Sequence, residues 1–141
     1  MRRVAKLPTR RKSTVLVIRR GPPDELLFRA SPSRARSGWE PLSAEVAPGE
    51  TFETTARRLA RDATDLARDA PVDLDLEARY AVRSGPAAGA WIERLYAFEA
   101  APGAPAREGE WLVHYEAKAR ASTPRVRDAV TRLREQARLR P

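Results

Sequence analysis

The sequence predicts a single α/β domain with a mixed sheet, and three observations support this fold class. The chain has 141 residues, which is enough to bury one hydrophobic core. Residues 15–18 read Val-Leu-Val-Ile, and such an apolar run is typical of a strand buried on both faces of a mixed sheet. Residues 72–80 alternate apolar and polar side chains as a strand does, whereas residues 52–63 carry apolar side chains at helical spacing.

The first predicted element is a β-hairpin. Its strands are expected within residues 13–18 and 25–29, which are both rich in apolar residues. Between them lies Gly21-Pro22-Pro23-Asp24, a combination that breaks regular structure and favours a turn. Residues 31–38 are polar and rich in Ser and Arg, so they predict a loop that leads to Trp39.

An amphipathic helix is predicted after the Pro48-Gly49 turn. Thr51 is suited to cap its N-terminus. The apolar residues that follow recur with the period of one helix face. They are Phe52, Ala56, Leu59, Ala60 and Ala63. Asp62 is expected on the flank of this apolar stripe.

The second half of the chain predicts three more strands. Residues 72–80 and 91–99 have strand patterns and are separated by a Gly- and Pro-containing loop at residues 84–89, so they are expected to pair. A further strand is predicted at residues 108–116.

A terminal helix is predicted to follow. Ser122 or Thr123 can cap it, and Pro124 is tolerated in its first turn. Its buried stripe is expected to contain Val126, Val130, Leu133 and Ala137. Two domains would leave neither with a core, so residues 13–141 are predicted to form one domain after a basic N-terminal arm of residues 1–12.

Residues 44–66 resemble the Nudix box, whose pattern is G, five residues, E, seven residues, R-E-U, one residue, E-E, one residue, G-U, where U is aliphatic. Glu50 matches the first Glu and Arg58 the Arg. Asp62 stands for the first Glu of the acidic pair, and Leu66 matches the last aliphatic residue. The spacing of the box is therefore retained.

Five positions depart from the box. The opening Gly, the Glu after Arg, the aliphatic position, the second Glu of the pair and the late Gly are replaced by Ala44, Leu59, Ala60, Ala63 and Asp65, respectively. Upstream, the aliphatic strand, the strand ending in Arg29 and the segment Gly38-Trp39 occur in the order that the family shows. The resemblance therefore implies a Nudix-type α/β/α sandwich with a mixed sheet, a box helix and a C-terminal helix.

The resemblance also implies a chemistry and a set of site residues. Nudix enzymes cleave nucleoside diphosphates linked to another group, with carboxylates holding Mg²⁺ or Mn²⁺. Here Glu50, Arg58 and Asp62 are the candidate catalytic residues, and Asp62, Glu50 and a late acid, Glu110 or Glu108, are the candidate metal ligands. Glu50 has the alternative role of pairing with Arg58.

The replaced acids predict an eroded metal site. Losing one well-placed electrostatic contact commonly lowers a rate ~100-fold or more, and both Leu59 and Ala63 stand where the box has Glu. We therefore expect a protein that is non-catalytic or very weakly active and binds nucleotide or RNA, with Mg²⁺ or Mn²⁺ needed only for activity. Trp39 and Arg29 are candidate nucleotide contacts, although packing remains an alternative role for Trp39.

The charge of the chain favours polyanionic partners. Lys and Arg number 27 against 19 Asp and Glu, which gives a formal net charge of +8. The candidate nucleic-acid contacts in the predicted basic arm are Arg2, Arg3, Lys6, Arg10, Arg11 and Lys12. A solvated tail, or the codon bias of a GC-rich genome, explains the same residues without a ligand.

Composition excludes several other classes of site. Cys is absent and His114 is the only His, so disulfides, thiolate sites and sites with two imidazoles from one chain are excluded. No apolar run reaches the ~20 residues that cross a bilayer, and the first residues lack the apolar core of a signal peptide.

We expect a cytoplasmic protein with a nucleotide, RNA or protein partner. One alternative is an active Mg²⁺-dependent Nudix pyrophosphohydrolase. The other is a sensor that binds a small ligand without cleaving it.

Overall fold

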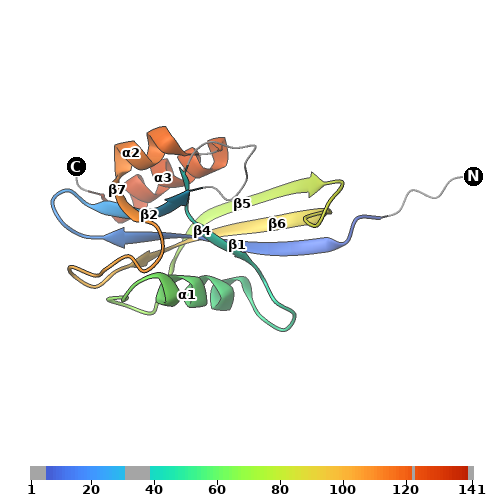
Figure 1. Ribbon diagram of the computed structural model, residues 1–141, viewed down its shortest axis with the longest axis horizontal. Helices are drawn as coiled ribbons and strands as arrows, with labels where there is room; N and C mark the ends of the chain where they lie inside the picture. Colours follow the sequence, from blue (N-terminus) through green and yellow to red (C-terminus); the bar gives the residue numbers. More distant parts are fainter. Residues whose placement is uncertain (1–5, 31–38, 122, 140–141) are drawn as a thin grey trace, which may run out of the picture.

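A mixed β-sheet lies between two helical layers in the computed structural model (Figure 1). The structure describes residues 6–30, 39–121 and 123–139. One face of the sheet is covered by a single helix and the other by two. The helices are α1 (Phe52–Ala63), α2 (His114–Arg120) and α3 (Pro124–Ala137). This arrangement confirms the predicted α/β/α sandwich with its box helix and C-terminal helix.

Seven strands form one sheet within the described residues. They are β1 (Thr9–Arg19), β2 (Glu25–Ala30), β3 (Trp39–Glu40), β4 (Leu42–Glu45), β5 (Val72–Val82), β6 (Gly89–Glu99) and β7 (Glu110–Val113). The main order is β3-β2-β1-β6-β5. β1 runs parallel to β6, and the other paired strands are antiparallel. The predicted hairpin and the predicted pairing of the two strands after α1 are both confirmed.

The two faces of β1 contribute to two separate parts of the core. Leu16 and Ile18 belong to the cluster under α2 and α3, whereas Val15 and Val17 belong to the cluster under α1. Because successive side chains of a strand point to opposite faces, a strand covered on both sides requires an apolar residue at each position. The prediction that this run is buried on both faces is confirmed.

The loop and cap before α1 are fixed by backbone geometry. Gly49 has a φ of +85°, a conformation that glycine adopts without strain. The Thr51 side chain caps α1 by accepting from Thr54 N at 3.1 Å, and Ser13 Oγ donates to Phe52 O at 2.6 Å. The first turn of α1 is therefore held against β1.

The C-terminal helices agree with the sequence in one part and differ in another. Thr123 caps α3 by accepting from Val126 N, and Pro124 occupies its first turn, as predicted. The strand predicted at residues 108–116 is wrong beyond Val113, because α2 begins at His114. Residues 116–120 read Glu-Ala-Lys-Ala-Arg, and their high helix propensity outweighs the strand propensity of Tyr115 before them.

The N-terminal boundary also differs from the prediction. β1 begins at Thr9, so the boundary predicted between residues 12 and 13 falls inside a strand. Arg10, Arg11 and Lys12 pair with residues of β6, and Arg10 also forms an ion pair with Glu45. These long-range contacts make the three cations part of the sheet. Among the helices that the structure describes, none is long and apolar enough to cross a membrane.

Candidate functional site

Glu50 and Arg58 form the best-defined ion pair of the box. Arg58 Nη1 donates to both carboxylate oxygens of Glu50 at 2.7 and 2.6 Å, and Thr55 Oγ1 donates to Glu50 Oε1 at 3.4 Å. The hydrogen bonds from Arg58 lower the pKa of Glu50 below its ordinary value. The predicted pairing is confirmed, and the Glu50 oxygens are already engaged within the protein.

The other acids predicted to hold a metal are Asp62, Glu110 and Glu108. Asp62 is exposed on α1, Glu110 is exposed at the start of β7, and Glu108 pairs with Arg29 at 2.7 Å. Within the ranges that the structure describes, no group of three or more His, Asp or Glu side chains is placed to hold a metal ion.

Leu59 and Ala63 face the core where the box has acids. Ala63 has no exposed surface and belongs to the cluster with Val17 and Phe98, while Leu59 is partly buried against the same cluster. Hard divalent cations require several oxygen ligands, and this side of α1 supplies a butyl and a methyl group. The residues of the box therefore do not fit a Mg²⁺ or Mn²⁺ ion held as in the Nudix pattern.

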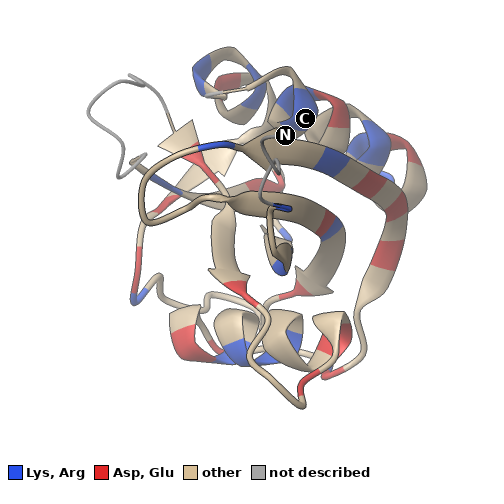
Figure 2. Cartoon of the chain, turned by 90° about the vertical axis from the view of Figure 1, so that its right-hand side faces the viewer, with Lys and Arg blue, Asp and Glu red and all other residues tan. Residues whose placement is uncertain are grey.

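A loop between β6 and β7 closes over the C-terminal end of α1. Arg107 N donates to Ala63 O at 2.8 Å, and Thr64 Oγ1 donates to Pro105 O at 2.7 Å. The Arg107 guanidinium pairs with Asp65. Asp65 is therefore the counterion of Arg107. α1 itself carries both acidic and basic side chains (Figure 2).

The predicted nucleotide contacts Trp39 and Arg29 lie on neighbouring strands. Ala30 pairs with Trp39 and Arg29 with Glu40. Trp39 is partly buried against the core, so packing accounts for much of its ring. Arg29 has its Nη1 on Glu108 and leaves a buried Nε with no hydrogen bond among the described residues. Their role as ligand contacts stays a prediction.

The residues predicted to bind nucleic acid do not share one surface among the described residues. Arg2 and Arg3 lie outside the described residues, and Lys6 is exposed just before β1. Inside β1, the Arg10 guanidinium lies 4.4 Å from the centre of the Trp91 ring, and that of Arg11 lies 5.6 Å from the centre of the Phe52 ring. Lys12 lines a small cleft on the opposite face of the sheet from α1.

This small cleft contains a carboxylate that the sequence reasoning did not identify. Glu93 is 4% exposed; Thr14 Oγ1 donates to its Oε2 at 2.5 Å, and Arg125 Nη2 lies 3.3 Å from its Oε1. Oε1 has no hydrogen bond among the described residues. Glu93 lies on the same face of β6 as the buried residues Trp91 and Leu95. A charged residue at an inward position of a strand is the signal that could have revealed it.

Aromatic rings and cations extend from this cleft along the sheet. Tyr80 and Trp91 stack with their ring centres 6.4 Å apart. Arg125 lies over Tyr80 at 4.5 Å and Arg10 over Trp91 at 4.4 Å. The contacts order both guanidinium groups, because a cation is attracted to the face of an aromatic ring.

Comparison with known proteins supports the fold at low sequence identity. No family model and no curated protein sequence matches the chain. A protein of Listeria monocytogenes assigned to the Nudix hydrolases superposes with a TM-score of 0.69 at 14% identity, covering 92% of this chain and 97% of its own.

Two further solved structures agree. The E. coli dihydroneopterin triphosphate pyrophosphohydrolase has a TM-score of 0.64 at 16% identity over 91% of this chain and 95% of its own. A C. elegans Ap4A hydrolase has a TM-score of 0.61 at 13% identity over 90% and 98%. The sheet order, the helical layers and these superpositions together show that this chain has the Nudix fold.

Proposed function

We propose that this chain is a non-catalytic or very weakly active Nudix-fold protein that binds a nucleotide or RNA. The observation that carries the proposal is the position of Leu59 and Ala63, which pack into the core under α1 where the box pattern has acids. Glu50, the acid that remains at the start of the box, is held by Arg58.

Electrostatics explains why hydrolysis is expected to be slow. Cleavage of a phosphate linkage develops negative charge that must be stabilised by preorganised groups. Asp62 and Glu110 are both exposed, and neither is part of a group of three or more candidate ligands among the described residues. Loss of two box acids together is expected to lower the rate by well over ~100-fold, since one such contact alone is worth about that much.

The binding part of the proposal rests on charge and on the fold. The chain has a formal net charge of +8, which favours phosphorylated ligands. Two proteins that share its fold are named for substrates that contain several phosphates, dihydroneopterin triphosphate and Ap4A. A phosphorylated nucleotide or an RNA is therefore the ligand class that best fits the chain.

The test separates binding from turnover. The purified protein is incubated with nucleoside triphosphates, diphosphate-linked nucleotides and RNA, with Mg²⁺, with Mn²⁺ and with EDTA, and products are resolved by ion-exchange chromatography. Thermal unfolding is measured with the same ligands, because a bound ligand raises the midpoint by mass action. We expect ligand-dependent stabilisation that persists in EDTA, with no metal-dependent product.

Asp62→Asn is the matched variant, because Asp62 is exposed and stands for the first Glu of the acidic pair of the box. We expect it to leave both ligand stabilisation and the absence of product unchanged. Metal-dependent turnover by the native chain that disappears in Asp62→Asn would establish the alternative, an active Nudix pyrophosphohydrolase. Absence of stabilisation by every nucleotide and RNA tested would contradict the binding role.

A further inference from the structure

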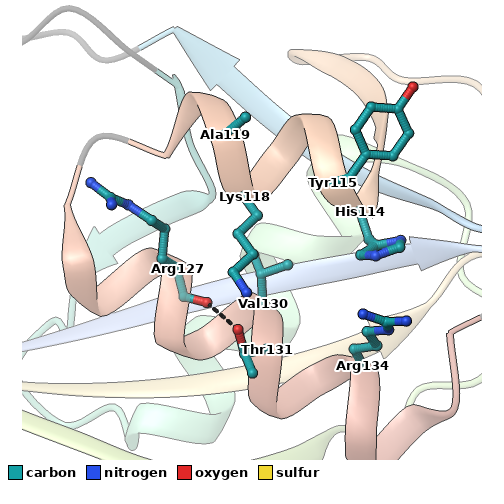
Figure 3. A pocket seen from close by; sticks show the side chains of 8 residues that line it. All are labelled: His114, Tyr115, Lys118, Ala119, Arg127, Val130, Thr131 and Arg134. Atoms are coloured by element: carbon teal, nitrogen blue, oxygen red, sulfur yellow. Dashed lines mark hydrogen bonds between the residues drawn. The ribbon is translucent and has the colours of Figure 1, made fainter.

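A groove of about 560 Å³ lies between α2 and α3, away from the box and on the opposite side of the sheet. Figure 3 shows Lys118 of α2 extending toward Val130 of α3, and the His114 ring facing the Arg134 guanidinium. Arg127 stands at one end of the groove, where its carbonyl accepts from Thr131 Oγ1 at 3.1 Å. Val130 has no exposed surface, so the floor is apolar and the walls are polar.

Sequence spacing builds the two walls. Arg127, Thr131 and Arg134 are four and three residues apart on α3, and His114 and Lys118 are four apart on α2. Residues at these spacings share one face of a helix. α2 and α3 pack against each other, so the two rows of side chains face a common groove.

The charge of the groove is positive and is not neutralised by its own walls. The described residues that line it include Lys118, Arg127 and Arg134 and no Asp or Glu. The acids of these helices, Glu116, Asp128 and Glu135, lie outside the lining. Within the described part of the chain, none of the three lining cations forms an ion pair.

The histidine in the groove responds to this charge. Burial lowers the pKa of His114, and Arg134 and Lys118 lower it further by electrostatic repulsion. The same potential that disfavours a proton on His114 favours an anion in the groove.

Tyr115 places an aromatic ring at the His114 end of the groove, where the ring points away from the three cations (Figure 3). Tyr115 is 65% exposed, and it lines the groove at the end away from Arg127 (Figure 3). Cationic grooves with neighbouring exposed aromatic rings bind single strands, because the cations contact phosphates while a base stacks on the ring.

We propose that the groove between α2 and α3 binds the backbone of a single-stranded nucleic acid, with Lys118, Arg127 and Arg134 on phosphates and Tyr115 against a base. The proposal rests on the nucleic-acid part of the proposed function and assigns it a site. Arg127 and Arg134 are seven residues apart on α3, which separates them by about 10 Å along the helix axis. The cations of the groove can therefore contact more than one phosphate of the same strand.

The experiment is fluorescence anisotropy with a labelled single-stranded oligonucleotide at several salt concentrations. The groove variant is Lys118→Gln with Arg134→Gln, and the control is Arg83→Gln with Arg132→Gln, which removes two exposed cations outside the groove. Loss of two phosphate contacts should reduce the slope of log K against log salt by about 1.4, at about 0.7 for each contact. The control should keep the native slope.

Two further measurements decide the outcome. Tyr115→Ala should weaken binding by at least fivefold, because stacking on one base is worth about 1–3 kcal/mol. RNA and DNA oligomers of one sequence distinguish the two sources of the backbone, and groove-dependent binding of either supports the proposal. Equal slopes for the groove and control variants would overturn it, as would equal affinity of Tyr115→Ala and the native chain.

The outcome is distinguishable from failure of the proposed function. If the native chain is stabilised by nucleotides while the groove variants bind oligonucleotides normally, the site assignment fails and the proposed function stands. If the native chain binds neither nucleotides nor oligonucleotides, both fail. All substituted side chains are exposed, and thermal unfolding midpoints close to the native value verify that each variant is folded.

Discussion

Ala63→Glu restores a box acid and tests whether the position belongs to the core or to a cleft. Ala63 has no exposed surface and packs in the cluster with Val17 and Phe98. An ionised carboxylate placed there loses its hydration, so the pKa of the new side chain should rise far above its ordinary ~4.3, as for other buried Glu residues, which reach about 8–9. Ala63→Gln has a similar shape without the charge and is the matched control.

The magnitude follows from linkage between protonation and folding. The folded-state pKa is raised, so the folded form keeps the proton where the unfolded chain has released it, and stability falls as pH rises. Each pH unit above about 4.3 should widen the gap between the two variants by about 1.4 kcal/mol. At pH 7 the gap should reach about 3–4 kcal/mol, a large part of the ~5–15 kcal/mol that stabilises an ordinary domain.

Urea denaturation of both variants between pH 4 and pH 8 measures this gap. We expect it to be small near pH 4, to grow with pH and to be unaffected by Mg²⁺. A gap that does not change with pH would mean that the carboxylate reaches solvent. Stabilisation of Ala63→Glu alone by Mg²⁺ at neutral pH would mean that the position opens into a metal-binding cleft, and the reasoning about the box would then be wrong.

Two further predictions concern the C-terminal layer. Leu133→Ala should destabilise the fold by about 2–5 kcal/mol, because Leu133 is fully buried in the core. Urea denaturation measures this loss of stability. The control Arg132→Ala should stay within about 0.5 kcal/mol of the native chain, and equal effects of the two variants would contradict the packing. The imidazole of His114 should titrate by NMR below its ordinary 6.5 and shift upward in Arg134→Gln. The folded-state pKa of His114 is depressed, so the stability that the neutral imidazole contributes is present above pH ~6.5 and is lost as pH falls through the folded-state pKa. An unchanged titration in Arg134→Gln would contradict the repulsion assigned to Arg134.

Local patterns predicted the elements whose reasons are local. The stripe of α1 and its cap at Thr51 follow from residues within one helix, and the same holds for Thr123 and α3. α2 was missed because Trp111, Val113 and Tyr115 favour a strand, while residues 116–120 favour a helix. In so short a segment the sequence pattern alone does not show where the strand ends and the helix begins.

The site was predictable only where its residues are near in sequence. Glu50 and Arg58 are eight residues apart, across one turn and two helical turns, so their pairing could be inferred from the box. Glu93 meets Arg125 only because β6 and α3 lie together in the fold. A single sequence does not show which distant residues meet, so this ion pair between a buried carboxylate and a partly exposed guanidinium required the structure.

The parallel pairing of β1 with β6 has a consequence for synthesis on the ribosome. Residues 9–18 form their ladder with residues 90–99, about eighty positions later. β1 therefore has one edge unpaired until β6 has left the exit tunnel. Because closing so long a loop is slow and an unpaired apolar edge promotes aggregation, nascent chains stalled before residue 90 should be the form that depends most on chaperones.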